Sequence, residues 1–86
     1  MDEYSVVKYP VTTEKAVRLM QTENKLVFIV DRKSTKSQIK QALEKMLTIK
    51  IDKVNTLITP KGKKKVYITV NKEKQAIDIA SQLGFM

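Results

Sequence analysis

Residues 25–47 have the sequence KLVFIVDRKSTKSQIKQALEKML and contain the two clearest structural signals of the chain. The first part, KLVFIVD (25–31), is apolar at consecutive positions. Because neighbouring side chains on a strand point to opposite faces of its sheet, this run predicts a central strand that is covered on both sides.

The second part, STKSQIKQALEKML (34–47), predicts an amphipathic helix. Thr35 and Gln38 fit a capping box at its start. Apolar residues then recur at the spacing of one helix face, which predicts a single buried stripe: Ile39, Ala42, Leu43, Met46 and Leu47. The charged residues of this helix predict a solvated face: Lys36, Lys40, Glu44 and Lys45.

The segment before the central strand predicts a strand and then a helix. SVVKYPV (5–11) is rich in β-branched and aromatic residues, and Pro10 would end this strand or confine it to a sheet edge. Thr12 or Thr13 can cap the helix that follows, with Glu14 in its first turn.

The segment after residue 47 predicts a hairpin and a last helix. KVNTLIT (53–59) and KKVYITV (64–70) are the predicted strands, joined by a loop over residues 60–64 in which Gly62 can adopt a positive φ. Asn71 is the predicted cap of the last helix. Its inner face would carry Ala76, Ile79, Ala80 and Leu83, with Gly84 as the left-handed residue after it. The predicted order is therefore β-α-β-α-β-β-α.

Length and composition limit the classes of protein. A chain of 86 residues predicts one domain, 1–86, because a second hydrophobic core could not be built from the remaining apolar residues. Cysteine and histidine are absent, which removes thiolate and imidazole metal ligands and the usual neutral-pH base. The carboxylates are scattered, and neither Arg18 nor Arg32 has a nucleophile beside it. The composition predicts no enzyme, no metal and no cofactor.

The apolar runs of the chain are short. The longest, Leu26–Val30, is far below the roughly 20 residues that span a bilayer, and the N-terminus begins acidic. These features predict a soluble cytoplasmic protein without membrane insertion.

Positive charge is concentrated in one part of the sequence. Seventeen Lys and Arg oppose nine Asp and Glu, for a formal net charge of +8, and no acid occurs between Asp52 and Glu73. Such a concentration favours a polyanion, such as a nucleic acid or an anionic membrane surface. The acid-free window carries Lys53, Lys61, Lys63, Lys64, Lys65 and Lys72.

Four of these lysines, at positions 61 and 63–65, surround the turn of the predicted hairpin. Lysines at strand ends also prevent edge-to-edge aggregation, which would account for one or two of them. A phosphate backbone accounts better for four, because each lysine can neutralise a phosphate and release counterions. The turn therefore predicts contact with a nucleic-acid backbone.

A stacking surface for single-stranded RNA is a sharper alternative. KGKKKVYITV (61–70) begins like the RNA-recognition-motif signature, but Lys63 and Lys65 stand where that motif has aromatic residues. Only Tyr67 could stack, since Phe28 belongs to the predicted core strand. The hairpin therefore favours the shape and phosphates of folded RNA over unstacked bases.

Asn55 is a polar residue inside a predicted strand, where asparagine is disfavoured. Two partners remain open for its side chain: a neighbouring loop of the protein, and an RNA sugar or phosphate.

Several segments, in this order, resemble the L-twenty-three family of large-subunit ribosomal proteins: YPVTTEKA (9–16), NKLVFIVD (24–31), STKSQIKQALEKML (34–47), VNTLITPKGKKKVYITV (54–70) and AIDIASQLG (76–84). The resemblance covers essentially the whole chain and is most specific over residues 54–70. It implies an α+β fold, an α/β/α sandwich around a four-stranded antiparallel sheet. It also implies binding to large-subunit ribosomal RNA near the mouth of the polypeptide exit tunnel.

Bacterial members of this family carry a longer basic extension between the two hairpin strands. Here only residues 60–64 separate these strands, so the chain resembles the short archaeal-type form. The resemblance also implies neighbouring ribosomal proteins and the signal recognition particle as partners, with Glu14 as a docking position for ribosome-associated factors. A free-standing RNA- or DNA-binding module is the alternative, and we expect a monomer when the protein is free.

We expect the RNA contacts to come from two regions. The hairpin region comprises Lys53, Asn55, Thr56, Lys61, Lys63, Lys64, Lys65 and Tyr67, and the N-terminal region comprises Lys8, Thr12, Lys15 and Arg18.

Overall fold

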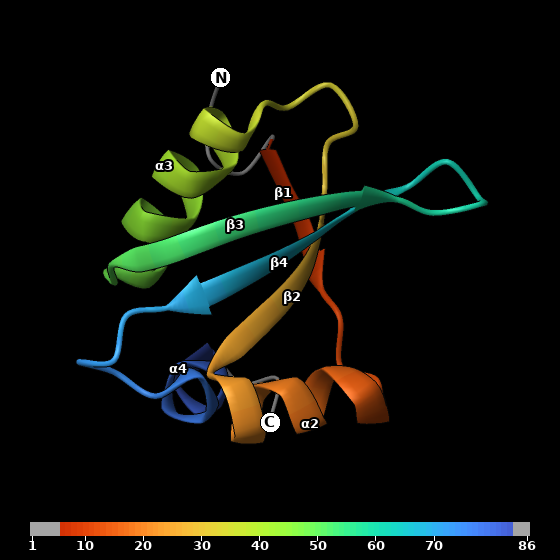
Figure 1. Ribbon diagram of the computed structural model, residues 1–86. Helices are drawn as coiled ribbons and strands as arrows, with labels where there is room; N and C mark the ends of the chain where they lie inside the picture. Colours follow the sequence, from red (N-terminus) through yellow and green to blue (C-terminus); the bar gives the residue numbers. More distant parts are fainter. Residues whose placement is uncertain (1–5, 84–86) are drawn as a thin grey trace.

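The computed structural model describes residues 6–83 and contains four strands and three helices within that range. The strands form one antiparallel sheet with the spatial order β1-β2-β4-β3 (Figure 1). The predicted order β-α-β-α-β-β-α is therefore confirmed. The elements are β1 (Val7–Pro10), α2 (Glu14–Glu23), β2 (Lys25–Val30), α3 (Lys36–Leu47), β3 (Ile51–Ile58), β4 (Lys64–Val70) and α4 (Ala76–Leu83).

The sheet has helices on both faces, as expected for an α/β/α sandwich. Leu26 and Phe28 of β2 point to one face and join a core cluster that includes buried residues of α3 and α4. The other face carries Val27, which lines a shallow hollow together with Ala16 of α2. We call the two surfaces the core face and the α2 face. Five consecutive residues of β2 are buried, which confirms the predicted central strand.

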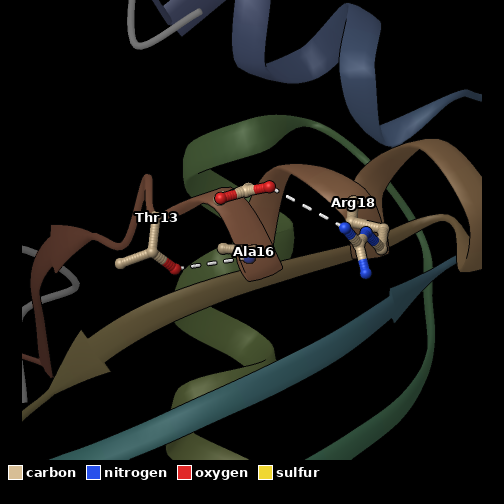
Figure 2. Close-up of polar contacts among 4 residues, drawn as sticks. Thr13, Ala16 and Arg18 are labelled. Atoms are coloured by element: carbon tan, nitrogen blue, oxygen red, sulfur yellow. Dashed lines mark hydrogen bonds and ion pairs between the residues drawn. The ribbon is translucent and has the colours of Figure 1, made fainter.

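The starts of two helices agree with their sequence signals. Thr13 is the N-cap of α2, and its hydroxyl accepts the N–H of Ala16 at 3.3 Å (Figure 2). At α3, Thr35 and Gln38 form both hydrogen bonds of a capping box, at 3.2 and 3.0 Å. These bonds satisfy backbone donors that have no partner within a helix.

We expect Thr35→Ala to lower the free energy of unfolding by about 1 kcal/mol, because the Gln38 N–H loses its acceptor. Denaturation with urea measures this loss. Ser37→Ala, at an exposed position in the first turn of the same helix, is the control and should change stability by less than about 0.5 kcal/mol. Equal losses in the two variants would contradict the capping role.

Two predicted details of the helices are wrong. Asn71 does not cap the last helix, because α4 begins at Ala76, and the Asn71 side chain instead accepts the N–H of Glu73 within the preceding loop. The carboxylate of Glu44 does not lie on a fully solvated face, since it is half-buried and accepts the N–H of Ile51 at 3.0 Å. The predictions for the Leu83 side chain and for Gly84 lie outside the described residues.

The N-terminus of α4 is capped from another part of the chain. The Asn24 side chain accepts the N–H of Ala76 at 2.6 Å and donates to the carbonyls of Val70 and Lys74, both at 3.0 Å. Its backbone carbonyl also accepts the N–H of Val70 at 3.0 Å. Asn24 is the C-cap of α2 in the left-handed conformation, with φ 56°. One residue therefore joins the end of α2, the end of β4 and the start of α4.

Candidate nucleic-acid interface

The tip of the β3–β4 hairpin is held by its own backbone. Thr59 and Lys63 form the closing pair: the N–H of Thr59 donates to the carbonyl of Lys63 at 2.8 Å, and the Thr59 hydroxyl accepts the Lys63 N–H at 3.1 Å. Gly62 has φ +83°, which glycine adopts without steric cost, so its predicted role is confirmed. The loop spans residues 59–63: β4 begins at Lys64, as predicted, whereas β3 ends at Ile58, one residue before the predicted end of the first strand. Figure 1 shows this loop projecting beyond the other elements.

The hairpin ammonium groups are not neutralised by carboxylates of the described chain. Within residues 6–83 the ion pairs are Arg18–Glu14, at 3.8 Å, and Lys25–Glu23, at 3.4 Å, and neither involves the hairpin. Lys61 and Lys63 are exposed, and Lys65 is half-buried with its ammonium 5.7 Å from the centre of the Tyr67 ring. The positive charge at the tip is therefore available to an external anion.

The pairing register divides the predicted hairpin residues between the two faces of the sheet. Asn55 pairs with Tyr67, and Val27 pairs with the same Tyr67, so these three residues lie on the α2 face. Lys53 and Lys65, two residues from this row on their strands, share that face. We call the open part formed by Lys53, Asn55, Lys65 and Tyr67 the sheet patch.

Thr56 and Lys64 lie on the core face instead. The ammonium of Lys64 donates to the backbone carbonyl of Ser34, in the loop before α3. The structure therefore brings together the hairpin tip and the sheet patch but turns these two predicted residues to the opposite side.

Asn55 is exposed, and its side chain forms no hydrogen bond with any residue of the described range 6–83. The first of its two predicted partners, a neighbouring loop, is therefore not found in this part of the chain. Its amide is open to a ligand on the α2 face.

The N-terminal region reaches the same face through α2. Lys15, Lys65 and Tyr67 line the hollow at the start of this helix, so residues of both predicted regions meet there. Lys8 and Thr12 are exposed nearby in sequence, on β1 and before α2.

Arg18 lies one turn further along α2, and its guanidinium pairs with the carboxylate of Glu14 (Figure 2). The two side chains are 73% and 92% exposed, so this pair contributes at most about 0.5 kcal/mol and leaves both groups accessible.

Two residues that the sequence analysis did not select lie beside the hairpin tip. The Tyr9 hydroxyl accepts a hydrogen bond from the Lys63 ammonium at 3.0 Å, and Tyr9 is 45% exposed. The guanidinium of Arg32 lies next to Gly62. Their signal in the sequence is weak, because Tyr9 and Arg32 precede the hairpin by many residues and only the sheet order brings them to it.

The described residues contain no group of three or more acidic side chains placed to hold a metal ion. Among the described helices, none is long and apolar enough to cross a membrane.

The fold and the charge define a class of protein: a small, basic α+β domain whose excess positive charge lies on a β-hairpin and the sheet surface beside it. The family model described as Ribosomal protein L23 matches residues 5–79. A curated relative, the large ribosomal subunit protein uL23 of Methanococcus aeolicus, is 45% identical over 84 residues, which cover 98% of each chain. The chain belongs to the ribosomal protein L23 family, and the resemblance seen in the sequence is confirmed. This is a family of structural proteins rather than of enzymes.

Proposed function

We propose that the protein is a structural constituent of the large ribosomal subunit and binds large-subunit ribosomal RNA through the hairpin tip and the sheet patch. The observation that carries this proposal is the part of the hairpin after Asp52, which contains no acid and whose exposed lysines have no carboxylate partner within residues 6–83. Membership of the L23 family and the printed name of the M. aeolicus relative support the ribosomal assignment.

The two parts of this surface suit two kinds of RNA contact. Lys61 and Lys63 lie on a turn whose backbone is already held by hydrogen bonds. Phosphate binding therefore does not have to order this backbone, which lowers the entropic cost of binding. The sheet patch adds the amide of Asn55 and the phenol of Tyr67, which can hydrogen-bond ribose hydroxyls and phosphate oxygens. Lys15 would continue the contact onto α2. Such contacts recognise the shape of a folded RNA rather than its sequence.

The finer assignment concerns the position on the ribosome. By family resemblance we place the protein in the cytoplasmic ribosome near the exit tunnel mouth, next to other ribosomal proteins. The short loop of residues 59–63 suits the archaeal-type form. Glu14, 92% exposed on its side chain, is the proposed docking position for nascent-chain factors such as the signal recognition particle. When free of the ribosome the protein would be a monomer.

The salt dependence of RNA binding tests the proposal. If four to six cations meet phosphates, the affinity for large-subunit ribosomal RNA should fall with salt at a log–log slope of about −3 to −5. Filter binding at several salt concentrations measures this slope, and footprinting of the same RNA locates the contacts. A slope near zero, or protection no stronger than on an unrelated folded RNA, would overturn the proposed function.

A further inference from the structure

A groove of about 480 Å³ lies between β1, the residues that follow β2 and the hairpin tip. We call it the tip groove. Its volume is within the range of ordinary small-ligand sites, about 300–1,000 Å³. The groove lining combines apolar and aromatic surface with cations, and the residues used below are Lys8, Tyr9, Ile29, Arg32 and Lys63.

Tyr9 presents its aromatic ring to this groove. The ammonium of Lys63 is 3.0 Å from the Tyr9 hydroxyl oxygen but 5.5 Å from the ring centre. It therefore lies beyond the hydroxyl end of the ring rather than above the ring face. Tyr9 pairs with Ile29 in the sheet, so an apolar side chain lies beside it on the same face. The groove has an aromatic surface that the cation leaves open.

Four cations line the groove. The ammonium of one, Lys64, is bound to the Ser34 carbonyl, and the other three come from three different segments. Lys8 is on β1, Arg32 follows β2, and Lys63 is in the hairpin loop. A Cβ on Gly62 would lie 3.5 Å from a guanidinium nitrogen of Arg32, so the Arg32 guanidinium lies close to the backbone of the hairpin tip. The one acid of the lining, Asp31, accepts the N–H of Lys33. Positive charge therefore dominates the groove.

We propose that the tip groove binds one unstacked nucleotide of RNA, with its base on the Tyr9 ring and its phosphate between Arg32 and Lys63. The inference rests on the proposed function and deepens it. A site for phosphate alone would need the cations but not the aromatic wall, whereas a base needs a flat apolar surface next to them. Folded RNAs offer such nucleotides in loops and bulges. Arg32 suits the phosphate because its planar fork binds two oxygens at once.

Tyr9→Leu tests this inference in the full-length protein with large-subunit ribosomal RNA. Loss of one base–aromatic stack should weaken binding roughly 5- to 150-fold at constant salt, whereas the salt slope should not change because no cation is removed. Tyr9→Phe, which keeps the ring, should recover most of the lost affinity. Since Tyr9 is on an edge strand, the thermal unfolding midpoint of each variant is measured to exclude loss of the fold.

A second measurement does not depend on a substitution. Ribosomal RNA that contains 4-thiouridine, bound to the wild-type protein and irradiated, should attach to the peptide that contains Tyr9. Wild-type affinity in Tyr9→Leu, or attachment only to peptides outside the groove, would overturn the inference while leaving hairpin binding intact. Failure of the proposed function looks different, because wild-type binding itself would then lack salt dependence.

Discussion

Asn24→Gly is expected to lower the free energy of unfolding by about 1.5–4 kcal/mol, because the variant loses three side-chain hydrogen bonds that together join α2, β4 and α4. Glycine accepts the left-handed backbone of position 24 without steric cost, so the loss of stability does not come from a strained backbone. The total stability of a chain of this length is roughly 4–13 kcal/mol. One substitution at a half-buried helix cap therefore removes a large fraction of it.

Thr48→Gly is the matched control for this prediction. Thr48 is the C-cap of α3 and is also left-handed, with φ 53°, but its exposed side chain forms no hydrogen bond within the described residues. Relief of the left-handed strain of a β-branched residue should raise the free energy of unfolding by about 0.5–1 kcal/mol. Urea denaturation of both variants measures whether the free energy of unfolding falls in Asn24→Gly and rises in Thr48→Gly. A loss of stability in both would show that the added freedom of glycine in the unfolded chain, and not the Asn24 network, decides the effect.

The starts of α3 and α4 show which parts of the fold could be predicted from the sequence. The helix α3 was predictable because its signals are local: Thr35 and Gln38 are three residues apart, and its apolar stripe repeats within the helix. The cap of α4 was not, because Asn24 precedes Ala76 by 52 residues. Asn71 is closer in sequence and has a side chain that can cap a helix, but it lies in the loop before α4 and accepts the N–H of Glu73 there. Tertiary hydrogen bonds of this kind leave no periodic pattern in a sequence.

The residues of the candidate interface also divide into those that the sequence could place and those that it could not. Alternation along each strand groups Lys53 with Asn55 and Lys65 with Tyr67, because residues two apart share a face, but only the pairing register brings the two groups together. It could not place Lys64, whose ammonium contacts the Ser34 carbonyl of a distant loop. Nor could it identify Tyr9, since the order β1-β2-β4-β3 and the reach of Lys63 bring it to the hairpin. The lysines of the hairpin could be located from the sequence, whereas the face that each residue occupies and the position of Tyr9 beside the hairpin required the fold.

The joint replacement of Lys61, Lys63 and Lys65 by alanine is expected to make the salt slope of RNA binding about two to three units shallower, because each lost phosphate contact removes one set of released counterions. Lys64 is left unchanged, since its ammonium is already bound to Ser34. Filter binding to large-subunit ribosomal RNA between low and physiological salt measures the slope. Affinity should fall most at low salt, where counterion release contributes most.

The control is the joint replacement by alanine of three lysines that are exposed on α3: Lys36, Lys40 and Lys45. Both triple variants lower the formal net charge of +8 by the same amount, so they differ only in where the charge is lost. We expect the slope of the α3 variant to stay within about one unit of the wild-type slope, because long-range attraction alone is screened beyond about 10 Å at 0.1 M salt. Equal slopes in the two triple variants would mean that the protein attracts RNA by net charge and that the hairpin is not the binding site. A change confined to the hairpin variant would locate the phosphate contacts there, because a general loss of folded protein reduces the amount that binds without changing the slope.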